Sequence, residues 1–146
     1  MAGLQPAGRF RRDQRIVRRA EYRVVHATAR RVVTGHFVFL LRARASPPGA
    51  QARLGISVSR QQGNAVARNR TKRLIREAFR ATRPLWAADV DVVVLLRRPL
   101  GSVDLGGVVR EWQSASPRLE RTIQSARADR ESRLANRPQT TQTPRG

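Results

Sequence analysis

The sequence predicts a single α+β domain, and three observations point to that class. The chain has 146 residues, a length at which one hydrophobic core is expected rather than two. Residues 63–80 place apolar side chains at helical spacing, whereas residues 53–59 alternate between apolar and small or polar side chains, as a strand does. Residues 90–97 form a nearly continuous apolar run, which is typical of a central strand covered on both faces.

The N-terminal part of the chain predicts an arm followed by a short helix. We expect residues 1–13 to be flexible, because they carry Gly, Pro and Arg with little apolar periodicity. Residues 18–28 suit an amphipathic helix. Within it, Tyr22 is either a core residue or an exposed ring on which a base can stack. His26 alone is more typical of a surface residue than of a ligand.

Two strands are expected after this helix. Residues 31–45 carry apolar side chains on both faces and form one strand, straight or kinked at Gly35. The Pro-Pro-Gly content of residues 46–51 predicts a turn, so we expect the strands on either side to pair as an antiparallel hairpin. In residues 53–59 the core face is Leu54, Ile56 and Val58, and the opposite, small face is Gly55, Ser57 and Ser59. That small face is either a solvent face or a place where another molecule approaches the backbone.

The C-terminal part predicts one more helix and a tail. Residues 105–123 suit a helix that Pro117 either ends or kinks. Residues 125–146 are polar, contain Pro and lack an apolar period, so we expect a disordered tail there. The folded domain is then expected to span residues 14–124.

The composition favours a polyanionic partner. The chain has 30 Lys and Arg against 10 Asp and Glu, a formal charge of +20, and such self-repulsion is usually relieved by a polyanion. Lys72 is the only lysine, so the charge is almost all guanidinium, a bias that genome base composition can also produce. There is no cysteine for disulfides or a zinc site. No apolar run approaches 18 residues and the N-terminus lacks a signal-peptide pattern, so we expect no membrane partner.

The helix over residues 63–80 has two chemically opposite faces. Its apolar face is expected to hold Val66, Ala67, Thr71, Leu74, Ile75 and Ala78, and its polar face Asn69, Lys72, Arg73, Arg76 and Arg80, with Arg68 and Arg70 near the borders. Like charges at i, i+4 destabilise a helix, so this row is either a solvated face or a surface for an anion. We favour the anion, because forked guanidinium groups match phosphate oxygens. Asn64 is a natural N-cap, and the free N–H groups beside it can hold a phosphate.

A protein nuclease would need clustered carboxylates or a histidine pair. Asp89 and Asp91 are the only close acids on a core strand, and at i, i+2 they are expected to share one face. They are either a metal site, for which no third acid stands nearby in sequence, or simply acids at a strand entrance. His26 and His36 lie on different elements. The residues therefore predict an RNA-binding surface without an evident active site in the protein.

The polar pattern of the long helix resembles the signature of the bacterial ribonuclease P protein component, the protein subunit of that ribonucleoprotein. The signature consists of Arg68-Asn69-Arg70, Lys72-Arg73 and Arg76, preceded by Gly63-Asn64-Ala65-Val66 and by a strand with the sequence LGISVSR. The resemblance extends from about Phe10 to about Arg121 with the same element order.

The resemblance implies a compact α/β sandwich in αβββαβα order, similar to the second domain of a ribosomal protein. Its strand–helix–strand unit, here residues 53–97, crosses over with the rare left hand. The resemblance also implies a cytoplasmic, non-catalytic subunit of an endoribonuclease. Such a subunit binds the catalytic RNA and the 5′ leader of precursor tRNA, and takes no small-molecule substrate. The RNA performs the cleavage with Mg²⁺, and the protein alone binds no cofactor.

The resemblance also assigns residues, none of them catalytic or metal-binding. The catalytic RNA would contact Arg60, Asn64, Arg68, Asn69, Arg70, Lys72, Arg73 and Arg76. The leader would lie in a cleft between the first helix and the sheet, at Tyr22, His26, Leu40 and Ser57. The family commonly has an aromatic residue where His26 stands and often one where Leu40 stands, while Gln61 replaces a usual lysine. Two alternatives stay open: a ribosomal or chaperone-like RNA-binding protein without a catalytic partner, and an independent metal nuclease using Asp89 and Asp91.

Overall fold

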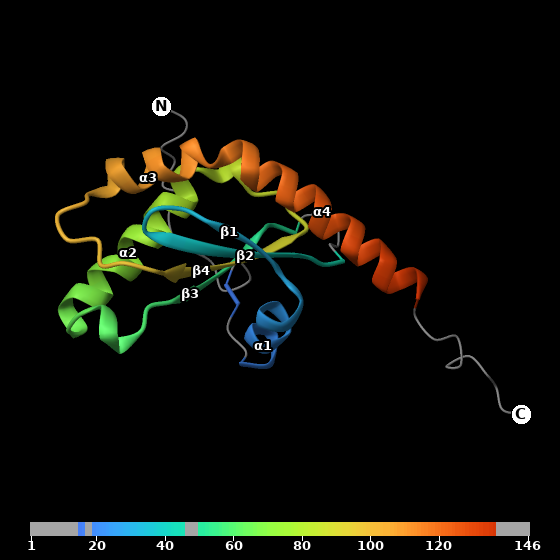
Figure 1. Cartoon of the computed structure of the whole chain (residues 1–146), viewed down its shortest axis with the longest axis horizontal. Helices are drawn as coiled ribbons and strands as arrows, with labels where there is room; N and C mark the ends of the chain where they lie inside the picture. Colours follow the sequence, from blue (N-terminus) through green and yellow to red (C-terminus); the bar gives the residue numbers. More distant parts are fainter. Residues whose placement is uncertain (1–14, 17–18, 46–49, 137–146) are drawn as a thin grey trace, which may run out of the picture.

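A four-stranded sheet separates one helix from three others in the computed structural model of the chain (Figure 1). The structure describes residues 15–16, 19–45 and 50–136. Their elements are α1 (Arg19–Thr28), β1 (Arg30–Val33), β2 (Phe37–Ala43), β3 (Arg53–Ser57), η3 (Arg60–Gln62), α2 (Ala65–Ala81), η4 (Arg83–Leu85), β4 (Val90–Leu96), α3 (Leu105–Ser114) and α4 (Ser116–Ala135). This order confirms the expected α/β arrangement, with the last helix divided in two. The arm expected over residues 1–13 lies outside the described residues.

The strand order is β1-β2-β4-β3, which places β4 inside the sheet as expected. The predicted hairpin between residues 31–45 and 53–59 is wrong, because β4 lies between these segments, antiparallel to β2 and parallel to β3. The first segment instead folds on itself at the turn before Phe37, so that β1 and β2 form an antiparallel pair. β4 takes the inner position because it is buried at all but one of its residues and needs a neighbour on each side.

The main core lies between the sheet and the three helices α2, α3 and α4. Its centre is a cluster of aromatic rings around the fully buried Trp112, which meets Phe39 edge to face at a centroid distance of 5.2 Å. A smaller core lies on the opposite face under α1, where Val25 packs on Leu40 and Val93. The sheet therefore has both faces covered, one by three helices and the other by one.

The C-terminal helix differs from the prediction in two ways. Pro117 divides it, because α3 ends at Ser114 and Pro117 occupies the first turn of α4, where a missing N–H costs nothing. The disordered tail expected from residue 125 is wrong for residues 125–135, which continue α4. Ala126 is buried there, and the turns beyond it are held by arginine contacts to the sheet. Anchoring of that kind leaves no apolar period in the sequence.

Within the described ranges, no helix is both long and apolar enough to cross a lipid bilayer.

Candidate nucleic-acid interface

One side of α2 is sealed against the main core. Thr71, Leu74, Ile75, Ala78 and Phe79 are its buried residues, which confirms the apolar face from Thr71 onward. The prediction is wrong for the first turn, where Val66 is 77% exposed and Ala67 is also exposed. The first turn packs against neither of the two cores, so its apolar residues stay at the surface.

The opposite side of α2 presents the predicted cations. Asn69 and Arg73 are exposed, while Lys72 and Arg76 are half-buried toward the α1 side. Arg70 turns the other way and donates to the backbone oxygens of Gly101 and Val103, at 3.3 and 2.9 Å, in the loop before α3. Arg70 therefore has a structural role as well. The polar positions of the signature thus face in three directions: into solvent, toward α1, and toward the loop before α3.

The start of α2 is built as the sequence predicts. Asn64 is the N-cap, and its side chain accepts a hydrogen bond of 2.9 Å from the backbone N–H of Ala67. Gly63 has a φ of 139°, a conformation that side chains rarely adopt, so the turn into the helix requires glycine. Arg60 is exposed in the short η3 helix just before this turn, and Arg68 Nε donates to Gly63 O at 3.2 Å. The N-cap and the cations thus form one continuous surface.

Lys72 and Arg76 share a pocket of about 190 Å³ with Tyr22 of α1. The other lining residues are Arg15, Ile16, Leu54 and Ile56. Arg15 and Ile16 line it at the edge of β3, where Ile16 N donates to Leu54 O at 3.0 Å. The sequence predicts the α2 surface and the α1 cleft separately, and the structure joins them at this pocket.

Tyr22 is fixed by the backbone of β3. Its hydroxyl accepts from Ile56 N at 2.9 Å and donates to Ile56 O at 3.3 Å. Burial raises the pKa of the phenol, and the hydrogen bond with Ile56 opposes that rise. A Cβ at Gly55 would lie 2.9 Å from the Tyr22 hydroxyl oxygen, so the small face of β3 admits a close approach by the protein's own ring.

The other three predicted cleft residues lie in different surroundings. Ser57 is half-buried at the end of β3, and His26 is exposed in the last turn of α1. Leu40 is only 6% exposed, because it belongs to the small core under α1. The four residues therefore do not line one open groove. Tyr22 of α1 contacts β3, the strand that ends at Ser57, whereas Leu40 lies beneath α1.

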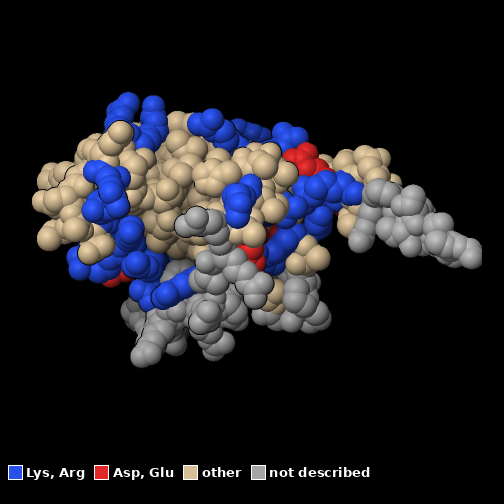
Figure 2. Space-filling model, turned by 90° about the horizontal axis from the view of Figure 1, so that it is seen from below, with Lys and Arg blue, Asp and Glu red and all other residues tan. Residues whose placement is uncertain are grey.

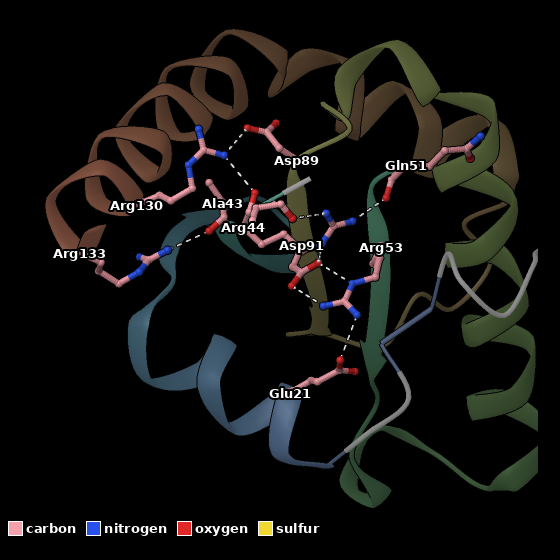
Figure 3. A network of polar contacts seen from close by, with 10 residues as sticks. Glu21, Ala43, Arg44, Gln51, Arg53, Asp89, Asp91, Arg130 and Arg133 are labelled. Atoms are coloured by element: carbon pink, nitrogen blue, oxygen red, sulfur yellow. Dashed lines mark hydrogen bonds and ion pairs between the residues drawn. The ribbon is translucent and has the colours of Figure 1, made fainter. Parts of the chain in front are cut away.

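The carboxylates of Asp89 and Asp91 are engaged by arginines (Figure 3). Asp91 is 3% exposed and accepts from Arg44 at 2.8 Å and from Arg53 at 2.9 Å. Asp89 accepts from Arg127 at 2.9 Å and from Arg130 at 3.0 Å, both on α4.

The expectation that these two acids share one face is wrong. Asp89 lies in the turn before β4 begins, so the alternation of side chains between the two faces of a strand does not apply to it. The hydrogen bond from Arg127 is the main cause of a lowered pKa at Asp89. In the part of the chain that the structure describes, no three His, Asp or Glu side chains gather as metal ligands would. The oxygens that the nuclease alternative needs already accept hydrogen bonds from guanidinium groups.

The two histidines also have separate roles. His36 Nδ1 lies 2.7 Å from Glu111 Oε1, and the second carboxylate oxygen accepts from His36 N at 2.7 Å and from Thr34 Oγ1 at 2.5 Å. Burial alone would raise the pKa of Glu111, but these hydrogen bonds outweigh it and lower the pKa. This contact ties the β1–β2 turn to α3, so His36 serves the fold while His26 is exposed on α1.

Positive charge is spread over the face shown in Figure 2, and it is densest in two clusters. Lys and Arg side chains cluster at the α2 end of the molecule, and again beside α4, where a few acidic atoms lie among them. The first cluster corresponds to the predicted surface. The second is not predicted by the sequence, because residues 125–135 of α4 were expected to be a disordered tail.

Comparison with known proteins gives a consistent result. The family model described as Ribonuclease P matches residues 10–120. The ribonuclease P protein component of Desulfovibrio desulfuricans is 36% identical over 119 residues, covering 80% of this chain and 91% of that protein. That of Oleidesulfovibrio alaskensis is 41% identical over 90 residues, covering 61% and 70%.

Two solved structures share the fold. The RNase P protein from Thermotoga maritima superposes with a TM-score of 0.62 at 29% identity, covering 71% of this chain and 96% of that one. The RNase P protein of Staphylococcus aureus gives a TM-score of 0.61 at 27% identity, covering 75% and 97%. Both solved proteins are matched almost completely, so what this chain adds lies outside the shared domain.

Proposed function

Because the chain belongs to the family of bacterial ribonuclease P proteins, we propose that the exposed side of α2 binds the catalytic RNA of this ribonucleoprotein. The chain is a protein component of ribonuclease P, which places it in tRNA processing with an RNA partner.

The observation that carries the proposal is the division of α2 into two sides. Burial of Leu74, Ile75 and Ala78 prevents the helix from rotating. The backbone positions of the cations are therefore fixed, and binding costs less backbone entropy than ordering a flexible basic tail would. The RNA-contacting set is Arg60, Asn64, Arg68, Asn69, Arg70, Lys72, Arg73 and Arg76. Arg70 would contact the RNA through those N–H groups that do not donate to the loop before α3.

The 5′ leader of precursor tRNA is proposed to lie along α1 and the end of β3. Tyr22 and Ser57 offer a ring and a hydroxyl there, and the pocket with Lys72 and Arg76 supplies charge for a phosphate. His26 lies further along α1, and Leu40 supports the helix from below. Leader binding at this place would continue directly into the α2 surface.

Cleavage is proposed to take place in the RNA subunit, with Mg²⁺ held by RNA. The support is the chemistry of the donor set, since the oxygens of Asp89 and Asp91 accept hydrogen bonds from arginines. Under this proposal the protein assists by positioning RNA and lowering its charge repulsion, which reduces the need for Mg²⁺. The proposed compartment is the cytoplasm, where precursor tRNA is made.

Reconstitution tests the proposal. The full chain is added to its cognate ribonuclease P RNA at low Mg²⁺, and cleavage of precursor tRNA is measured against RNA alone. We expect faster cleavage with the protein, and a smaller gain with the Arg68→Ala/Arg73→Ala variant. A protein that leaves the rate unchanged contradicts the proposal. Recovery of the chain with ribosomes and without ribonuclease P RNA would favour the ribosomal or chaperone-like alternative instead.

A further inference from the structure

The C-terminal half of α4 lies beyond the residues that the family model matches, which end at 120. It is nevertheless attached to the sheet at defined points. Arg127 forms two hydrogen bonds of 2.9 Å with Asp89, and Arg130 donates to Asp89 and to Arg44 O, both at 3.0 Å. Arg133 donates to Ala43 O at 2.9 Å. Figure 3 shows Arg130 and Arg133 pointing from α4 to the end of β2.

This attachment creates a pocket of about 430 Å³ between α4 and the end of β2. The residues that line it are Arg42, Arg44, Ala45, Arg130, Glu131, Arg133 and Leu134. Four are arginines, and Glu131, which is exposed, is the single carboxylate among these lining residues. Leu134 is 59% exposed and gives the pocket an apolar wall.

The four arginines are not equivalent. Arg44 and Arg130 form ion pairs with Asp91 and Asp89. Arg42 and Arg133 instead donate to neutral oxygens, Thr28 Oγ1 at 2.7 Å and Ala43 O at 2.9 Å. Among the described residues, neither forms an ion pair with a carboxylate, and each keeps N–H groups that could donate to a ligand.

The charges of Arg42 and Arg133 also repel each other. Burial and then the charge of Arg133 lower the pKa of Arg42, although the nearby Asp91 opposes this. Two guanidinium groups held together in this way favour an anion that accepts from both. A phosphodiester group has the required charge and several acceptor oxygens, and its ribose fits beside an apolar wall.

We propose that the pocket between the C-terminal half of α4 and the end of β2 is a second RNA-binding site, in which Arg42 and Arg133 bind a phosphodiester group. The site is separate from α2, since its residues come from β2, the two residues after it, and α4. The proposal rests on the proposed function to the extent that both assume an RNA partner. It adds that the RNA-binding area extends to the part of α4 that lies beyond the family-model match.

The test compares salt-dependent binding of the full chain to its ribonuclease P RNA and to precursor tRNA. The pocket variant is Arg42→Gln/Arg133→Gln. The matched control is Arg110→Gln/Arg121→Gln, which removes the same charge from exposed positions on α3 and the first half of α4. We expect the pocket variant to bind one of the two RNAs about tenfold more weakly than the control, with a slope of log K against log salt smaller by about 1.

A second variant distinguishes a loss of RNA binding from a loss of folding. Leu134→Glu adds negative charge to the pocket at an exposed position, so it should weaken RNA binding without lowering the melting temperature. Equal slopes for the pocket variant and its control with both RNAs would overturn the proposal. The proposal would also be overturned if the pocket variant lost binding of inorganic phosphate but bound both RNAs as the control does, because the pocket would then hold an adventitious ion only. The Arg68→Ala/Arg73→Ala variant separates the two proposals, because it reports on α2 alone.

Discussion

Asp91 of β4 accepts two parallel hydrogen bonds, each 2.9 Å long, from Arg53 on the neighbouring parallel strand β3. The two residues are direct partners in the strand register. Arg53 also donates to Glu21 of α1 at 3.0 Å, and Arg44 donates to the same aspartate from beyond β2. One buried carboxylate therefore joins α1, β3, β4 and the chain after β2.

Replacing this carboxylate should destabilise the protein strongly. We expect Asp91→Asn to lower the free energy of unfolding by about 3–5 kcal/mol, since it leaves Arg44 and Arg53 without their shared anion. Urea denaturation measures the change, and Glu120→Gln, at an exposed position on α4, is the control. A variant as stable as the control would show that the network contributes little.

RNA binding by the α2 surface should depend on salt concentration. We expect Arg68→Ala/Arg73→Ala to weaken binding to ribonuclease P RNA and to reduce the slope of log K against log salt by up to about 2, because two phosphate contacts are lost. Binding is measured from low to moderate salt, with Arg110→Gln/Arg121→Gln as the charge-matched control. An unchanged slope would argue against phosphate contacts at these two positions.

Glu111 should make the free energy of unfolding depend on pH in the acidic range. Its pKa is lowered in the folded state from an ordinary value of 4.5, so its contribution is complete above that value and is lost as pH falls through the folded pKa. We expect Glu111→Gln to be less stable than the parent at pH 7 and closer to it at pH 3. Unfolding free energies at both values test this, and a constant difference between the two proteins would contradict it.

Tyr22 combines a structural hydroxyl with a ring proposed to stack on RNA. Tyr22→Phe should cost about 1–3 kcal/mol of stability, because it leaves the backbone groups of Ile56 without their partner, yet it keeps the ring. Tyr22→Ala should in addition weaken leader binding by about 1–3 kcal/mol. Binding of a precursor tRNA, which carries the leader, is compared with binding of the same tRNA without its leader. An equal loss of affinity for both RNAs would exclude a leader contact.

The added part of α4 should stabilise the domain. A chain ending at residue 124 lacks Arg127, Arg130 and Arg133, and we expect it to melt at a lower temperature than the full chain. A chain ending at residue 136 keeps all three contacts and serves as the control. The prediction fails if the two truncated chains melt together.

Periodicity and residue chemistry were enough to predict much of this protein. The buried stripe of α2 from Thr71 onward, the inner position of β4, the cap at Asn64 and the interruption at Pro117 all follow from local rules, which depend on neighbours one turn or two residues away. The family signature is equally local, since it consists of polar residues at fixed spacing on one helix.

Other features were decided only by the tertiary structure, because they depend on contacts between residues far apart in the chain. β3 lies beside β4 and not beside β2, and Asp89 and Asp91 point to different arginines, since the strand begins between them. Leu40 became part of a core once α1 covered it. The segment after residue 124 carries polar side chains with no apolar period and is helical all the same, because Arg127 contacts a carboxylate in the turn before β4 and Arg133 a carbonyl of β2. No sequence pattern records a partner that folding brings from about 40 or 90 residues away.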